Sequence, residues 1–211
     1  KQGGVLQYLG QHTVPFAGQG LANDPVTGGL IGIHRAQRQV IVAGRKGAPV
    51  RLRVLCYNIH HAAGVDRKLD VPRIARVIQS VQPDLVALQE VDRNTTRTSK
   101  VDQAAELARL TRMNHVFGAN IAFQGGQFGN AILSRFPITE HRNHLLPNVD
   151  AGEQRGVLAA TIHVSKDRSL RLLATHFDHR RPDAERLASA KFVNQLTAKE
   201  PEMPTIFAGD L

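Results

Sequence analysis

From residue 50 onward, short apolar runs alternate with amphipathic segments, and this order constrains the fold more than any other feature. Residues 50–56 carry apolar side chains at every second position, which predicts a strand with one buried face. Asp70 precedes an early proline, Pro72, and apolar residues at helical spacing. This pattern predicts a helix that Asp70 caps and that ends before Pro83.

Further segments of both kinds follow along the chain. We expect strands at 84–90, 130–134, 138–146, 156–164, 170–176 and 205–208. Helices are expected at 101–112 and from an N-cap at Asp183 to about residue 198. Strands and helices in this order predict two sheets packed between helices.

Residues 1–49 differ in composition, being rich in Gly, Pro and Gln. They hold one expected strand pair, at 30–34 and 39–43, joined by a turn at 35–38, and residues 44–49 read as a linker. We interpret 1–49 as an N-terminal extension or the tail of a preceding domain, and 50–211 as the main domain. The chain starts at Lys1, so a lost signal peptide and export stay open, and no compartment is predicted.

The net charge of +9 favours a polyanionic partner, either nucleic acid or an anionic membrane surface. The arginines are spread along the chain, which weakens the case for nucleic acid. The chain contains no run of about 18 apolar residues, so no membrane span is predicted. The single cysteine, Cys56, excludes an internal disulfide and is interpreted as a buried small hydrophobe.

Four polar residues stand where expected strands end: Asn58, Glu90, His176 and Asp210. Strand ends that meet at one edge of a sheet are a usual place for a site. Carboxylate and amide oxygens suit Mg²⁺ or Mn²⁺, and a histidine can donate to a phosphoryl oxygen. Each residue alone is more often a turn residue or a structural histidine. The ordered set therefore carries the hypothesis, and no zinc-site pattern is present.

Six motifs follow one another along the chain: LCYNIHHAAG at 55–64, PDLVALQEVD at 83–92, GNAILSRFPI at 129–138, RG at 155–156, ATHFDH at 174–179 and AGD at 208–210. In order and spacing they resemble a bacterial branch of the endonuclease/exonuclease/phosphatase superfamily. The resemblance implies the fold class of that superfamily, a four-layer α/β sandwich in which two mixed β-sheets pack between helices.

The resemblance also implies roles for individual residues. Asn58 and Glu90 would hold a catalytic Mg²⁺ or Mn²⁺, with Glu90 the principal ligand. Asn130 would lie near the scissile phosphate, and His176 would contact the phosphoryl oxygens. Asp210 would be the first acid of the family's Gly-Asp-x-Asn motif and would activate water.

Several neighbouring residues have two open interpretations. Arg155 occupies the family's Arg-Gly position and would face the phosphate, or it forms a surface ion pair. The pairs at 60–61 and 178–179 are interpreted as loop residues near the site, although they could reach the substrate or a second metal. Residues 92–100 would form a substrate-facing rim or a solvated loop.

Two parts of the family pattern are absent from the chain, namely the Asn that would follow Leu211 in Gly-Asp-x-Asn and a closing Asp-His pair. We therefore expect a domain that is incomplete at the C-terminus and inactive, or nearly so, as this chain. The expected activity of the whole protein is hydrolysis of phosphate esters by in-line attack of water, as a phosphodiesterase, nuclease or phosphatase. The alternative is a non-catalytic binding module that keeps the fold, although Asn58 and Glu90 are both retained. The sequence leaves the substrate open among nucleic acid, phospholipid and small phosphate esters.

Overall fold

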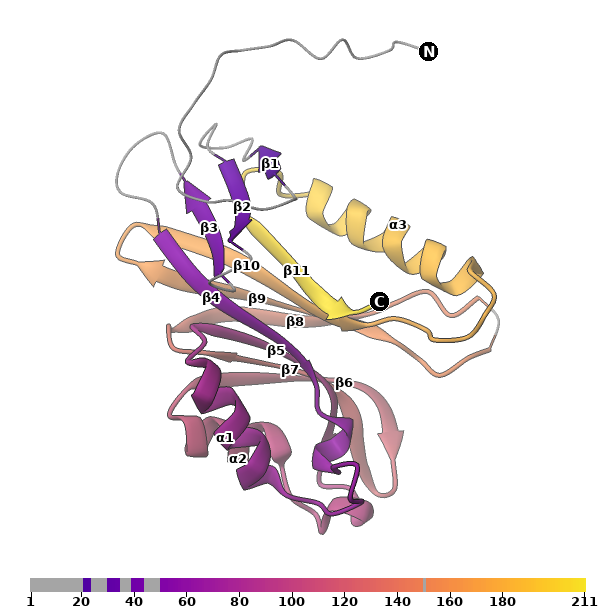
Figure 1. Cartoon of the computed structure of the whole chain (residues 1–211). Coiled ribbons are helices and arrows are strands. Elements are labelled where there is room, and N and C mark those ends of the chain that lie inside the picture. The colour runs from indigo at the N-terminus through magenta and orange to yellow at the C-terminus, as the bar shows by residue number, and fades with distance from the viewer. Residues whose placement is uncertain (1–20, 24–29, 35–38, 44–49, 150) are drawn as a thin grey trace.

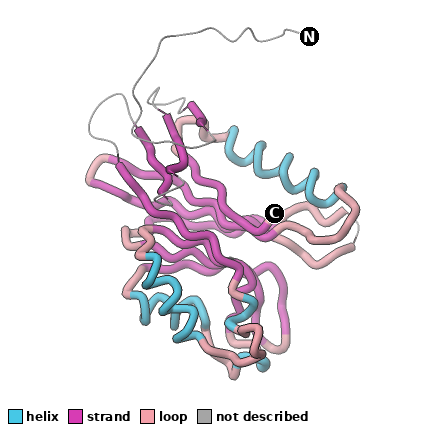
Figure 2. Tube along the Cα trace, in the orientation of Figure 1, coloured by secondary structure: helices cyan, strands magenta, loops and turns pink. Residues whose placement is uncertain are grey.

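A computed structural model describes residues 21–23, 30–34, 39–43, 50–149 and 151–211. Two mixed β-sheets pack face to face, and helices cover their outer faces (Figure 1). Helices α1 and α2 lie on one sheet and α3 lies on the other, so the layers run helix, sheet, sheet, helix (Figure 2). This arrangement confirms the expected α/β sandwich.

The first sheet has the strand order β1-β2-β3-β4-β5-β7-β6. Its strands are β1 Leu21–Asn23, β2 Leu30–His34, β3 Gln39–Ala43, β4 Val50–Asn58, β5 Leu85–Arg93, β6 Asn114–Phe123 and β7 Gly126–Ser134. Strands β4 and β5 are parallel, whereas the other neighbours are antiparallel. The parallel pair brings the carboxyl ends of two strands to the same edge.

Strands β2 and β3 occupy the two segments expected from the sequence, and β3 pairs with β4. This part of the N-terminal segment therefore extends the first sheet. The expected turn at 35–38 and the linker at 44–49 lie outside the described residues.

The second sheet has the order β11-β10-β9-β8. Its strands are β8 Ile138–Leu145, β9 Gly156–Ser165, β10 Arg168–His176 and β11 Thr205–Asp210. Strands β10 and β11 are parallel, and their register places His176 opposite Asp210. Between the sheets lies an apolar core to which both contribute, including Leu52, Ile132 and Leu172. Burial of these side chains holds the two sheets together.

The helices are α1 Val71–Val81, α2 Gln103–Thr111 and α3 Ala184–Ala198. Asp70 caps α1 as expected, because its Oδ1 accepts a hydrogen bond from the backbone N–H of Arg73 at 2.8 Å. Asp183 holds the N-cap position of α3, as expected. Its side chain makes no capping hydrogen bond, however, because its carboxylate pairs with Arg186 instead.

The main element absent from the sequence prediction is β6, which forms a hairpin with β7. Residues Gln124 and Gly125 between them both have positive φ, at 46° and 73°, as a two-residue hairpin turn requires. The two strands approach closely, since a Cβ at Gly129 would lie 1.9 Å from the carbonyl oxygen of Gly118. The hairpin lengthens β7 by four residues at its start relative to the expected strand at 130–134.

Cys56 is exposed, so its interpretation as a buried hydrophobe is wrong. It lies on the same side of β4 as the core residue Leu52, but its position near the end of the strand leaves it uncovered. None of the described helices is long and apolar enough to cross a membrane.

Candidate active site

Asn58, at the end of β4, connects carboxylates from both sheets. Its Nδ2 donates to Glu90 Oε1 at 2.7 Å and to Asp210 Oδ2 at 3.0 Å. The backbone N–H of His60 donates to Asn58 Oδ1 at 3.0 Å. Two other sequence-predicted residues, Glu90 and Asp210, therefore lie within hydrogen-bonding distance of Asn58. The amide would have to turn over to offer its oxygen to a cation.

Glu90 lies at an irregularity in the middle of β5 rather than at the end of a strand. The pairing register with β7 shifts between Leu88 and Val91, and Glu90 has a left-handed φ of 57°. Such a bulge inserts an extra residue and turns its side chain in a new direction. The glutamate consequently lines a cavity, whereas its neighbour Gln89 is fully buried.

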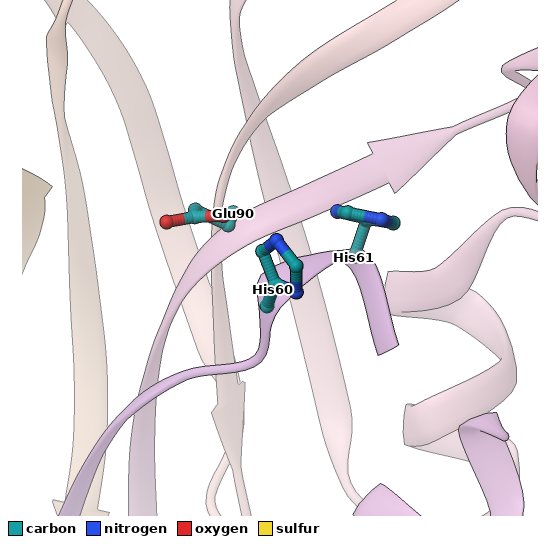
Figure 3. A group of neighbouring side chains, drawn as sticks. All are labelled: His60, His61 and Glu90. Carbon is teal, nitrogen blue, oxygen red and sulfur yellow. The ribbon is translucent and has the colours of Figure 1, made fainter. Parts of the chain in front are cut away.

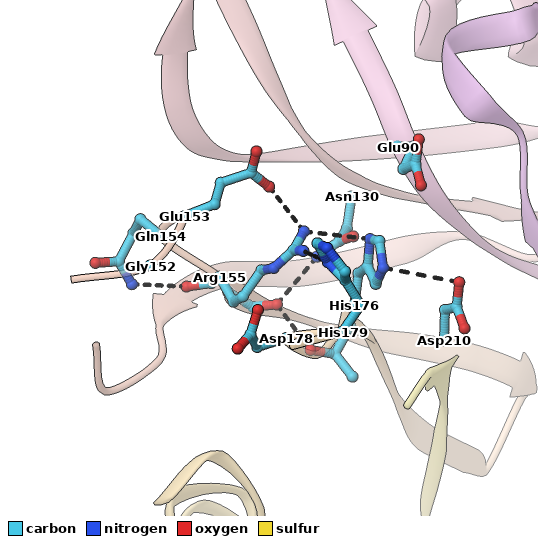
Figure 4. A network of polar contacts seen from close by, with 12 residues as sticks. Glu90, Asn130, Gly152, Glu153, Gln154, Arg155, His176, Asp178, His179 and Asp210 are labelled. Carbon is cyan, nitrogen blue, oxygen red and sulfur yellow. Dashed lines mark hydrogen bonds and ion pairs between the residues drawn. The ribbon is translucent and has the colours of Figure 1, made fainter. Parts of the chain in front are cut away.

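His176, the last residue of β10, lies between Arg155 and Asp210 (Figure 4). Its Nδ1 is 3.4 Å from Arg155 Nη1, and its Nε2 is 3.7 Å from Asp210 Oδ2. Because a guanidinium only donates, Nδ1 must be the unprotonated nitrogen and Nε2 carries the hydrogen.

Burial lowers the pKa of His176, and the positive charge of Arg155 lowers it further. The carboxylates of Asp210, Glu90 and Glu153 act in the opposite direction but do not outweigh these effects. The imidazole is therefore neutral at pH 7 and can donate one hydrogen bond from Nε2.

Arg155 is only 5% exposed, so its interpretation as a surface ion pair is wrong. Its Nη1 donates to Glu153 Oε1 at 2.8 Å, and its Nη2 lies 3.4 Å from His179 Nδ1. Its Nε is buried and has no hydrogen-bond partner among the described residues. The guanidinium is thus a fixed positive charge in the wall of the cavity.

Asn130 lies behind this row of side chains. It sits in the middle of β7 rather than at a strand end, and it is 1% exposed. Its Nδ2 donates to the carbonyl of Gly156 at 3.0 Å, and the same carbonyl accepts from Thr175 Oγ1 at 2.9 Å. Asn130 Oδ1 is buried without a partner in the described part of the chain. Asn130 therefore supports the backbone next to Arg155 and does not line the cavity.

The cavity has a volume of about 240 Å³. Its lining residues come from strands of both sheets and from the segments that follow or connect them: His60, His61, Glu90, Arg97, Ile121, Phe123, Phe128, Glu153, Arg155, His176 and His179. Arg97, Ile121, Phe123 and Phe128 form a wall of the cavity. Arg97 belongs to the segment at 92–100 that was expected to be a rim or a loop, whereas the other three were not predicted from sequence. Apolar residues alternate from 117 to 123 and precede a Gln-Gly-Gly turn, a pattern that could have revealed the hairpin carrying most of this wall.

Arg97 belongs to the segment at 92–100, which is anchored rather than solvated. Asp92 is fully buried and accepts from Arg97 Nε at 2.7 Å, from Arg97 Nη2 at 2.8 Å and from Thr95 Oγ1 at 2.6 Å. The Arg97 guanidinium lies over the Phe123 ring, 4.6 Å from its centroid. Arg97 is thus a second fixed cation in the lining of the cavity, besides Arg155.

Two other arginines that could contribute to a basic rim pair with carboxylates instead. Arg109 pairs with Glu106 at 2.6 Å, and Arg180 pairs with Asp178 at 2.8 Å. Of the arginines at 92–112 and 180–181, Arg97 is the one that lines the cavity within the described residues. A nucleic-acid partner stays a prediction.

The residue pairs at 60–61 and 178–179 differ in whether both members line the cavity. His60, His61 and His179 line the cavity, whereas Asp178 is 4% exposed and bonded to Arg180. Burial lowers the pKa of His61, and the charge of Arg97 adds to this effect. His61 is therefore neutral at pH 7.

The sequence profile of the Endonuclease/Exonuclease/phosphatase family matches residues 55–211. The chain belongs to this family. The uncharacterized protein YbhP of Escherichia coli strain K12 is 30% identical over 174 residues, which cover 75% of this chain. The same residues cover 65% of YbhP, so the chain spans somewhat less than two thirds of that relative.

Solved structures of the family share the fold. An endonuclease/exonuclease/phosphatase from Beutenbergia cavernae is 28% identical with a TM-score of 0.57, over 68% of this chain and 43% of that one. The mannosyl-6-phosphatase Bt3783 of Bacteroides thetaiotaomicron is 20% identical with a TM-score of 0.60, over 74% and 64%. TDP2 from Caenorhabditis elegans is 24% identical with a TM-score of 0.57, over 74% and 46%. The endonuclease/exonuclease/phosphatase family includes phosphatases and nucleases, which supports a hydrolase role.

Proposed function

We propose that this protein hydrolyses phosphate esters by attack of water, at a site formed by Asn58, Glu90, Arg155, His176 and Asp210. The observation that carries the proposal is the position of Asn58, which is hydrogen-bonded to a carboxylate from each sheet. A buried guanidinium and a neutral imidazole lie beside these carboxylates. A non-catalytic module would not require these charged groups to be gathered at one cavity.

The donor set fits a divalent cation. Glu90 and Asp210 bring two carboxylates to the same amide, and Asn58 offers an oxygen once its amide turns over. Such hard oxygen donors suit Mg²⁺ or Mn²⁺. When bound there, the cation supplies Lewis-acid chemistry to a phosphoryl oxygen.

The remaining groups have distinct tasks in this proposal. Arg155 attracts the phosphoryl oxygens through a charge that is already fixed, so little reorganisation is needed during the reaction. His176 donates from Nε2 to a phosphoryl oxygen, as its Nδ1 faces Arg155. Asp210, whose side chain is 53% exposed, accepts the proton of the attacking water.

The substrate carries a phosphoryl group next to a partly apolar leaving group. The cavity offers Arg155 and His176 on one side, and Ile121, Phe123 and Phe128 on another. Phosphomonoesters and phosphodiesters both satisfy this description. The two classes are separated by assay.

The test is hydrolysis of p-nitrophenyl phosphate, bis-p-nitrophenyl phosphate and plasmid DNA by the full-length gene product with Mg²⁺ or Mn²⁺. We expect Glu90→Gln to abolish turnover. Glu140→Gln, at an exposed glutamate of β8, is the matched control and should keep it. Arg155→Lys and His176→Gln should each lower kcat about 100-fold. Unchanged turnover in Glu90→Gln would refute the proposal.

A further inference from the structure

Three side chains beside the proposed phosphoesterase site form a group of a different chemical character. His60, His61 and Glu90 each offer a ligand atom, and these atoms all lie within 4.8 Å of one another (Figure 3). Two imidazoles and one carboxylate can coordinate one metal ion when their ligand atoms face a common point. This set differs from the all-oxygen set of Asn58, Glu90 and Asp210.

The backbone that presents these side chains is unusual. His60, His61 and Glu90 have φ values of 45°, 43° and 57°, in the left-handed region that non-glycine residues seldom adopt. Such conformations each cost roughly 1–3 kcal/mol and persist where the surroundings fix them, commonly at functional sites. Three strained residues at one point are therefore a sign of function.

The surroundings do fix the histidine segment. Gln103 Nε2 donates to the carbonyl of His61 at 2.7 Å, and the side-chain oxygen of Gln103 accepts from the backbone of Asp92 at 2.9 Å. Gln103 is 1% exposed, so this brace is buried. The position of His61 is thus tied to β5, the strand that carries Glu90.

Both imidazoles have a nitrogen available for an ion. His60 Nδ1 faces the carbonyl of Ala63 at 3.4 Å, an arrangement that places the hydrogen on Nδ1 and leaves the lone pair on Nε2. His61 Nδ1 is buried and has no hydrogen-bond partner among the described residues. A cation would satisfy that nitrogen, which is otherwise costly to bury.

We propose that His60, His61 and Glu90 bind a transition-metal dication of the Co²⁺ or Zn²⁺ class. This ion is separate from the cation proposed at Asn58, Glu90 and Asp210. Imidazole nitrogens suit these metals, whereas Mg²⁺ prefers oxygen. Glu90 can serve both sites because its carboxylate has two oxygens, and Oε1 is the one that accepts from Asn58. Three protein ligands leave positions open for water or a phosphoryl oxygen.

The test uses Co²⁺ as a spectroscopic probe of the full-length protein. Co²⁺ should bind and give visible absorption bands, Zn²⁺ should displace it, and excess Mg²⁺ should not. His60→Gln and His61→Gln should each weaken Co²⁺ binding by at least about 10-fold. His179→Gln is the matched control, because His179 lines the same cavity outside the group, and it should bind Co²⁺ as the unchanged protein does.

A second measurement does not depend on how the variants fold. Proton nuclear magnetic resonance of the Co²⁺-loaded unchanged protein should show hyperfine-shifted, exchangeable imidazole N–H signals. Absence of these signals would overturn the proposal, and so would equal Co²⁺ binding in both histidine variants. Asn58→Ala separates the two metal proposals, since it should abolish Mg²⁺-dependent hydrolysis and keep the Co²⁺ absorption bands.

Discussion

The pair Asp92–Arg97 allows a quantitative test of how the cavity wall is held. Asp92 is fully buried and accepts two hydrogen bonds from Arg97 and one from Thr95. Arg97→Met removes both charge-assisted bonds and leaves a buried carboxylate with the single hydroxyl of Thr95. Breaking a buried pair in this way typically costs 3–5 kcal/mol. The Arg97 side chain is 27% exposed, so water can replace part of the loss, and we expect about 3 kcal/mol.

The assay is urea denaturation followed by circular dichroism, arranged as a double-mutant cycle. Asp92→Asn removes the charge that needs Arg97, so the double variant Asp92→Asn/Arg97→Met should be more stable than Arg97→Met alone. Arg109→Met, which breaks an exposed pair with Glu106, is the control and should change stability little. Additive effects of the two changes, or an Arg97→Met variant within about 1 kcal/mol of the unchanged protein, would refute the reasoning.

Further predictions concern the imidazole, the core and the hairpin. His176 should titrate below its ordinary pKa of 6.5 in nuclear magnetic resonance, and Asp210→Asn should lower this pKa further because it removes a charge that raises it. Because the pKa of His176 is lower in the folded state than in the unfolded state, its contribution to stability is present above pH 6.5 and is lost as the pH falls through the folded-state pKa. A measured pKa of His176 at or above 6.5 would contradict this prediction. Leu172→Ala, in the core between the sheets, should cost about 2–5 kcal/mol in urea denaturation, whereas Leu187→Ala, at a side chain 68% exposed, should cost far less. Gly129→Ala should destabilise by about 1–3 kcal/mol, because the new Cβ would lie 1.9 Å from a backbone carbonyl of β6, and a neutral effect on the melting temperature would contradict that contact.

The parts of the site that follow from sequence are those that strand order brings together. Asn58 ends β4, and His176 and Asp210 end two neighbouring parallel strands. Carboxyl ends of parallel strands meet at one edge of a sheet, so a polar residue at each end predicts a shared site. The apolar alternation at 50–56 also predicted the buried face of β4 that carries the core residue Leu52.

Other parts depend on contacts between distant residues and carry no local signal. The left-handed bulge that turns Glu90 toward the cavity results from the register of β5 against β7, which no short pattern encodes. The burial of Asp92 depends on Arg97 folding back over it. The apolar run that begins at Asn130 predicts a strand starting there, whereas the hairpin with β6 extends β7 by residues that precede Asn130 in the sequence.

The left-handed backbone at His60 and His61 has a consequence for selection experiments. Glycine adopts such φ values without steric cost, and asparagine adopts them more easily than most residues. Replacing either histidine by glycine should therefore relieve about 1 kcal/mol of strain. A library randomised at these two positions and selected only for resistance to proteolysis should accumulate glycine and asparagine. Selection of the same library for retention on immobilised Co²⁺ should return histidine at both positions, so the two selections would pull the same two residues in opposite directions.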